Sequence, residues 1–191
     1  MLTELATVKA RLGIADATDD ALLTGYIQQA SAMFERHCNR VFARTVAATQ
    51  EFPANELEIA LRYYPIEVIS AIHLKTSEDG GWELQSDVAY LLRGACILSF
   101  SSPLGSSRVQ ARVTYTGGYV LPGTAPGAGQ IALPKDVENA CVEQVCYWYR
   151  ARHRGGINSA SGGQASIGLE SGLGLLRVVK DTLELYHRIQ L

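Results

Sequence analysis

The most constraining feature of this sequence is a strand that leads into a long helix in the second half of the chain. Residues 108–116 alternate between two kinds of side chain, and the odd-numbered positions from Val109 to Tyr115 are apolar or small. This period of two predicts a strand with one buried face. A loop rich in glycine and proline covers residues 117–133, and Pro134 then suits the first turn of a helix. This order predicts an α+β fold.

The helix predicted at residues 134–153 is apolar around more than half of its circumference. One apolar stripe runs from Val137 to Trp148, and a second stripe beside it runs from Val142 to Tyr149. Such a helix packs against more than one partner. We therefore place it at the centre of a helical bundle core.

Two N-terminal helices are expected to complete that core. A short helix ends at Gly13, because glycine readily adopts the left-handed conformation that follows a helix. A longer helix begins after Asp19 and Asp20, whose negative charge suits a helix N-terminus. It continues to about residue 39, where the sequence pattern changes.

The C-terminal part of the chain predicts a flexible arm followed by a final helix. Residues 155–174 contain seven glycines and four serines, and such a segment cannot bury enough apolar surface to order itself. Residues 175–191 have an apolar stripe through Val179 and Leu183 at helical spacing. This stripe either docks on the chain's own domain or binds a groove of a partner.

Between the helices the sequence changes to short runs with a period of two. Asp79-Gly80-Gly81 is typical of a hairpin turn. The connections are too short for parallel crossovers, so an antiparallel β subdomain is predicted as an insertion between the helices. The predicted strands cover residues 45–52, 57–61, 66–74, 82–84, 89–92, 96–100 and 108–116.

The chain is predicted to form a single domain over residues 1–191. Its parts are the N-terminal helices at 1–40, the β subdomain at 41–119, the loop and central helix at 120–154, the flexible arm at 155–174 and the C-terminal helix at 175–191.

Composition excludes several classes of protein. The 17 basic and 19 acidic side chains nearly cancel, and no part of the chain has the one-sided basic excess of a general DNA-binding protein. The sequence shows no signal peptide and no run of about 20 apolar residues, so we expect no membrane partner and synthesis in a cytoplasm. The four cysteines form no C-x-x-C pair and are predicted to be buried, reduced thiols.

Residues with the pattern of a catalytic or metal site are not evident. The four histidines are scattered, whereas a metal site needs ligands at short recurrent spacings. The glycines of residues 155–174 fit neither a P-loop nor a dinucleotide-binding fingerprint. We predict no catalytic residues, no cofactor, no metal and no enzymatic activity. The histidines are His37, His73, His153 and His187.

One basic cluster, which we call the arginine cluster, comprises Arg150, Arg152 and Arg154 at the end of the central helix. One interpretation is that these cations offset the helix dipole. The alternative is contact with DNA phosphates or with acidic residues of a partner. The aromatic side chains, including Trp82 and Trp148, are assigned to core or interface packing, because no basic residues interleave with them.

Two groups of motifs resemble the phage head-tail connector (adaptor) protein family, in its longer form with a β insertion. The first is Val-Lys-Ala-Arg-Leu-Gly-Ile at residues 8–14, followed by Asp-Asp-Ala-Leu-Leu at residues 19–23. The second is Val-Thr-Tyr-Thr-Gly-Gly-Tyr at residues 113–119, followed by Leu-Pro-Lys-Asp-Val-Glu-Asn-Ala at residues 133–140. The motifs occur in the order and spacing that the resemblance requires.

The resemblance implies a structural virion protein of a bacteriophage or prophage, made in the host cytoplasm and located at the head-tail junction. Such proteins form a ring under the portal, extend the DNA channel and dock the stopper or tail. The implied partners are the portal protein, a stopper or tail-completion protein, DNA passing transiently through the channel, and further copies of the chain, twelve on the portal. The expected interface residues are Tyr26, Met33 and Arg36 for the ring and Leu183, Tyr186, Ile189 and Leu191 for the portal.

Two other functions stay open on the sequence alone. One is a nucleic-acid-binding module that uses the arginine cluster, which predicts DNA binding with a steep salt dependence. The other is a stopper or tail-completion protein, which differs from an adaptor in the partner that it binds first.

Overall fold

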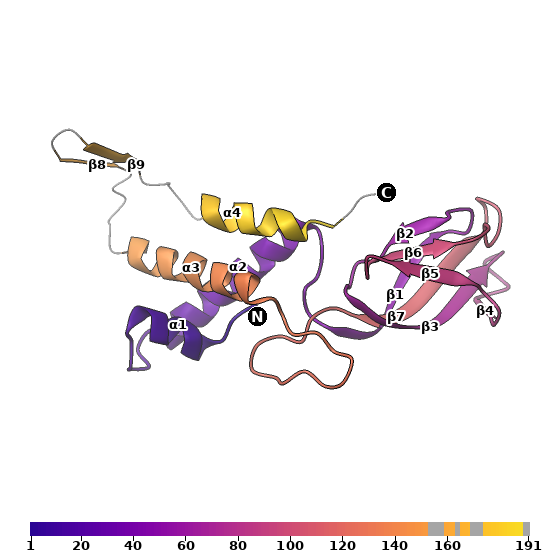
Figure 1. Cartoon of the computed structure of the whole chain (residues 1–191), viewed down its shortest axis with the longest axis horizontal. Helices are drawn as coiled ribbons and strands as arrows, with labels where there is room; N and C mark the ends of the chain where they lie inside the picture. The colour runs from indigo at the N-terminus through magenta and orange to yellow at the C-terminus, as the bar shows by residue number, and fades with distance from the viewer. Residues whose placement is uncertain (153–158, 163–164, 169–173, 189–191) are drawn as a thin grey trace. The chain divides into compact units, whose positions relative to one another are not determined.

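The computed structural model describes residues 1–152, 159–162, 165–168 and 174–188 (Figure 1). The chain separates into two compact units. A helical unit is formed by Met1–Cys38 and Leu133–His187, and a β unit is formed by Asn39–Ala132 together with the C-terminal residues from Arg188. The predicted α+β class and the predicted β insertion are both confirmed. The β unit is longer than the predicted residues 41–119, because the loop up to Ala132 belongs to it.

The helical unit is built around one central helix, α3, as the sequence predicts. Figure 1 shows α3 between the N-terminal helices and α4, and α3 contacts all three of the other α-helices. Its apolar positions from Val137 to Trp148 are buried on several sides, with Cys141 and Val145 fully so. The α-helices are α1 (Leu5–Leu12), α2 (Asp20–Cys38), α3 (Lys135–Ala151) and α4 (Arg177–Leu183).

The final helix is shorter than the predicted residues 175–191. After α4 the chain tightens into a 3₁₀ turn, η2 (Glu184–Tyr186), and His187 leaves the helix with φ −58° and ψ 137°. Arg188 then donates a hydrogen bond from Nη2 to the Ala60 carbonyl, at 2.6 Å, within the β unit. The helical conformation therefore ends before His187.

The predicted flexible arm contains a short hairpin. Strands β8 (Ser159–Gly162) and β9 (Ala165–Gly168) pair in antiparallel fashion. Composition did not predict these strands, because strand pairing is made by backbone hydrogen bonds that composition does not report. The prediction of flexibility for the segments 155–158, 163–164 and 169–173 lies outside the described residues.

The β unit contains the seven predicted strands, each within two residues of its expected ends. They form a four-stranded antiparallel sheet in the order β1-β7-β3-β4 and a three-stranded antiparallel sheet in the order β2-β6-β5. The strands are β1 (Thr45–Pro53), β2 (Glu58–Ala60), β3 (Ile66–Lys75), β4 (Glu83–Gln85), β5 (Tyr90–Arg93), β6 (Ile97–Phe100) and β7 (Gln110–Gly117).

One hydrophobic core lies between the two sheets of the β unit. Phe52 of β1 stacks on Phe100 of β6, with ring centroids 6.0 Å apart. The predicted inner face of β7 is confirmed, since Ala111, Val113 and Tyr115 are all fully buried. The Tyr115 hydroxyl keeps its polar contact by accepting hydrogen bonds from two successive backbone N–H groups at 3.1 and 3.2 Å.

The Gly117-Gly118 pair at the end of β7 is required by close backbone approach. A Cβ atom at Gly117 would lie 2.4 Å from the Tyr63 carbonyl oxygen, and one at Gly118 would lie 2.6 Å from the Ala43 carbonyl oxygen. Gly118 also has φ +106°, a backbone conformation that residues other than glycine rarely adopt. This part of the motif therefore encodes the packing of the β unit.

Candidate protein-interaction surfaces

Helix α2 carries the three residues predicted for the ring interface. Arg36 is exposed and Met33 is half-buried. Tyr26 is also half-buried, because its ring packs against Trp148 of α3 at 5.9 Å between centroids. The exposed side of α2 between Asp20 and Glu35 has no charged residue. Depletion of charge is typical of interface cores, so this side of α2 is a candidate interaction surface.

Helix α4 docks on its own unit, which answers one of the two alternatives for the final helix. Val179 and Leu183 are buried against α3 and α2, and the Cys38 thiol donates to the Leu183 carbonyl at 3.6 Å. The Tyr186 hydroxyl donates to the Asp136 carboxylate at 2.7 Å. The predicted contact residues Ile189 and Leu191 lie outside the described residues.

The exposed apolar side chains of this segment differ from the predicted contact residues. Val178 is 65% exposed and Leu185 is 81% exposed, whereas Leu183 is fully buried. The two exposed residues lie off the apolar stripe that docks on the core. They are the side chains on α4 and η2 that offer apolar area to a partner.

Gln144 of α3 anchors the start of the C-terminal segment, and sequence reasoning missed it. Its side chain is fully buried. Its amide Nε2 donates to the Gly174 carbonyl at 3.1 Å, and its Oε1 accepts from the Leu176 N–H at 2.8 Å. A polar residue among apolar helix positions was the available signal, since a buried amide needs partners.

The arginine cluster is divided by the structure. Arg150 is exposed, whereas the Arg152 guanidinium makes a bidentate contact with Asp19 at 2.8 and 2.9 Å. Tyr149 donates to the same carboxylate at 2.5 Å. Arg152 thus joins the end of α3 to the start of α2. Arg154 lies outside the described residues.

Several aromatic side chains of the β unit are in contact with arginines. The Arg112 guanidinium lies 4.2 Å from the Trp82 ring, and the buried Arg40 guanidinium lies 3.3 Å from the Tyr64 ring. Basic residues therefore do meet the aromatic side chains in space, although they do not interleave with them in the sequence. Both contacts are made within the β unit and have the geometry of cation–π packing.

The four cysteines are buried, as predicted. Burial raises the pKa of the Cys141 thiol to about 12. Burial also raises the pKa of Cys96 and of Cys146. The raised pKa of these three thiols keeps them neutral at physiological pH, which disfavours nucleophilic chemistry because the thiolate is the reactive form.

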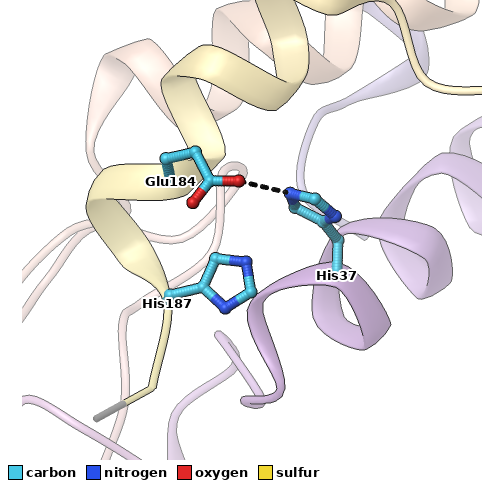
Figure 2. A group of neighbouring side chains, drawn as sticks. All are labelled: His37, Glu184 and His187. Carbon is cyan, nitrogen blue, oxygen red and sulfur yellow. Dashed lines mark ion pairs between the residues drawn. The ribbon is translucent and has the colours of Figure 1, made fainter.

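The structure brings together one group of potential metal ligands that the sequence analysis missed. Figure 2 shows His37 near the end of α2 facing Glu184 and His187, which project from η2 and the residue after it. The nearest ligand atoms of the three side chains lie within 4.8 Å of one another. The prediction that the histidines are scattered was wrong for this pair, because the docking of α4 on α2 joins positions far apart in the sequence.

Across the described part of the chain, no helix has both the length and the apolar character needed to cross a membrane.

The fold is shared with chains in solved structures of gene transfer agent (GTA) particles. One is the neck of an empty GTA particle computed with C6 symmetry, with a TM-score of 0.58, 14% identity, and coverage of 98% of this chain and 90% of that chain. Another is the virion of a native gene transfer agent (GTA) particle, with a TM-score of 0.57 and 16% identity. That match covers 98% of this chain and 90% of the other chain. A third is the neck of a native GTA particle computed with C12 symmetry, with a TM-score of 0.56 and 16% identity. That match covers 98% of this chain and 89% of the other chain.

No curated protein matches the sequence. The family model described as head completion protein matches residues 1–189. Because this match spans nearly the whole chain, the protein belongs to the head completion protein family, a family of structural virion proteins.

Proposed function

We propose that the protein is a head-tail connector that forms a ring under the portal, extends the DNA channel and docks a stopper or tail-completion protein. The observation that carries this proposal is the likeness to chains of GTA necks and virions over 98% of this chain, which includes both units. Two of the similar neck structures were computed with C6 and C12 symmetry, which fits a ring of identical subunits around an axis.

The proposed ring interface uses the uncharged side of α2. In a ring the contact is heterologous, so this side of α2 meets a different surface of the neighbouring copy. Tyr26 and Met33, both half-buried in the isolated chain, would lose their remaining exposed area there. Arg36 would lie at the end of the contact, where a charged group can keep its hydration.

The proposed portal contact uses the C-terminal segment. Val178 and Leu185 supply exposed apolar area, and Ile189 and Leu191 follow on the same segment. Leu183 and Tyr186 support this surface by fixing α4 and η2 against α2 and α3. Burial of the two exposed side chains on the portal would favour binding by the usual hydrophobic gain.

A binding experiment with the portal of the same virus tests the proposal. The purified chain is mixed with portal rings, and the product is sized by light scattering and viewed by electron microscopy. We expect a stoichiometric ring on the portal, which is weakened by the double variant Val178→Asp and Leu185→Asp. The matched control is Leu84→Asp on β4, where a leucine that is 63% exposed should tolerate the change without loss of binding.

The same experiment separates the connector from its alternatives. Binding to the tail-side partner but not to the portal would favour a stopper or tail-completion protein. Absence of portal binding, together with DNA binding that falls steeply with salt and is lost in Arg150→Ala, would favour the nucleic-acid-binding module. Either result would overturn the connector proposal.

A further inference from the structure

We infer that His37, Glu184 and His187 form a binding site for a divalent metal ion of the zinc class, which holds the turn after α4 against the end of α2. Two imidazoles and one carboxylate are a ligand set that suits Zn²⁺ and its neighbours in the first transition series. The inference does not depend on the proposed connector function.

The local backbone explains why the three side chains converge. A 3₁₀ turn has three residues per turn, so residues three apart, such as Glu184 and His187, lie on the same side. The bond from the Cys38 thiol to the Leu183 carbonyl fixes the end of α4 on the end of α2. Since His37 and Glu184 are the chain neighbours of these two residues, their side chains are brought face to face.

The separation of His37 and Glu184 fits a bridged pair better than a hydrogen-bonded pair. His37 Nε2 lies 3.6 Å from Glu184 Oε1 (Figure 2). A direct N–H···O hydrogen bond is centred near about 2.9 Å. Two ligand atoms at about 2.0–2.1 Å from a tetrahedral zinc ion lie about 3.3 Å apart. The observed separation is closer to the second value, so only a small movement is needed to admit an ion between the two atoms.

The His37 nitrogen provides an independent reason to expect a ligand. Its Nε2 atom is buried and has no hydrogen-bond partner among the described residues. An imidazole nitrogen that is removed from water without a partner is unfavourable. A metal ion would satisfy its lone pair. The His187 ring lies beside it, with centroids 5.0 Å apart, and its exposed position leaves it free to turn toward a shared ion.

A carboxylate and the C-terminal end of a helix at the site favour a cation. Glu184 contributes a carboxylate that is mostly exposed and can reorient at little cost. His37 lies in the last turn of α2, where the helix dipole presents negative potential. Three protein ligands leave a coordination position for water, which is a common arrangement around zinc. The bound ion would fix the segment at the point where it leaves the helical unit after His187.

Metal titration of the full-length, tag-free chain tests this inference. After treatment with a chelator, the protein is titrated with Zn²⁺ by calorimetry and with Co²⁺ by visible absorption. We expect one ion per chain, and slower amide hydrogen exchange in residues 184–187 when zinc is present. We expect His37→Gln and His187→Gln each to weaken binding by more than about tenfold, since even indirect partners of metal sites contribute 10- to 100-fold.

A matched control is His73→Gln, which removes a histidine of β3 in the β unit and should leave the affinity unchanged. Circular dichroism of each variant checks that it is folded. If His37→Gln fails to fold, the zinc affinities of His187→Gln and Glu184→Gln, which change exposed residues, test the inference instead. The inference is overturned if the wild-type chain binds no zinc at millimolar concentration, or if the folded ligand variants bind zinc as tightly as the wild type.

Discussion

The buried amide of Gln144 makes a sharp prediction about how the C-terminal segment is held. Gln144→Met keeps the length and approximate volume of the side chain but removes both hydrogen bonds. The Leu176 N–H, in a half-buried residue, would lose its partner, and a buried donor without a partner costs about 1–3 kcal/mol. The Gly174 residue is exposed, so water can replace the lost bond at its carbonyl at a cost nearer to about 0.5–1.5 kcal/mol.

The apolar methionine recovers part of this loss by packing in a dry site. We therefore expect a net destabilisation of about 1–3 kcal/mol for Gln144→Met, measured by urea unfolding. The neighbouring change Glu143→Gln is the control. Glu143 is half-exposed and pairs with Arg11 at the surface, where an ion pair contributes at most about 1 kcal/mol.

Hydrogen exchange at the Leu176 amide distinguishes the hydrogen bond from general destabilisation. In Gln144→Met we expect exchange at this amide to accelerate more, relative to the wild type, than exchange at the amides of α3. The reason is that the N-terminal end of the α4 segment opens locally. Unchanged protection of Leu176, with unfolding free energy within about 0.5 kcal/mol of the wild type, would refute the assignment of Gln144 as the anchor.

Three further predictions follow from the described contacts. Gly118→Ala should destabilise the β unit by more than about 3 kcal/mol in urea unfolding, because a positive φ and a backbone clash coincide there. Gly25→Ala, in open space on α2, is the control and should add about 1 kcal/mol of stability. Equal effects of the two substitutions would contradict this account. The folded state holds the Cys141 proton more tightly than the unfolded state, so the free energy of unfolding should fall as pH rises from 9 toward 12. Cys141→Ala should show a shallower fall over the same pH range. Identical pH dependence of the two proteins would argue against the raised pKa of Cys141. Asp19→Asn should lower the melting temperature by less than Gln144→Met does, because its pair with Arg152 is partly exposed to solvent, and a larger effect would show that this contact is underestimated.

The sequence was most informative where local periodicity and tertiary burial agree. In the strand before Gly117, the apolar side chains at alternate positions are all buried, so the period of two in the sequence matches the burial in the fold. The stripes of α3 predicted a central helix because a helix that is apolar on several sides has no other stable position. In both cases the pattern of one element is enough, and knowledge of its partners is unnecessary.

The functional candidates were less predictable because they depend on contacts between distant segments. His37 and His187 are at opposite ends of the sequence and meet only because α4 docks on α2. Gln144 bonds to backbone groups 30 and 32 residues further along the chain, and no spacing rule identifies such partners. The contact of Arg188 with the distant Ala60, just after the last helical turn, is likewise invisible to local patterns.

The path of the chain into and out of the two sheets of the β unit has a consequence for evolution. Ala43, near the start of this unit, forms a bridge with Tyr119, and the neighbouring Arg44 N–H donates to the Tyr119 carbonyl at 2.8 Å. Two chain segments that lie side by side can be joined by a very short connection, which is the condition under which whole units are gained or lost without disturbing their host. We therefore expect members of this family to gain or lose the stretch between these two positions as a single unit, while the sequences of the flanking helices are retained.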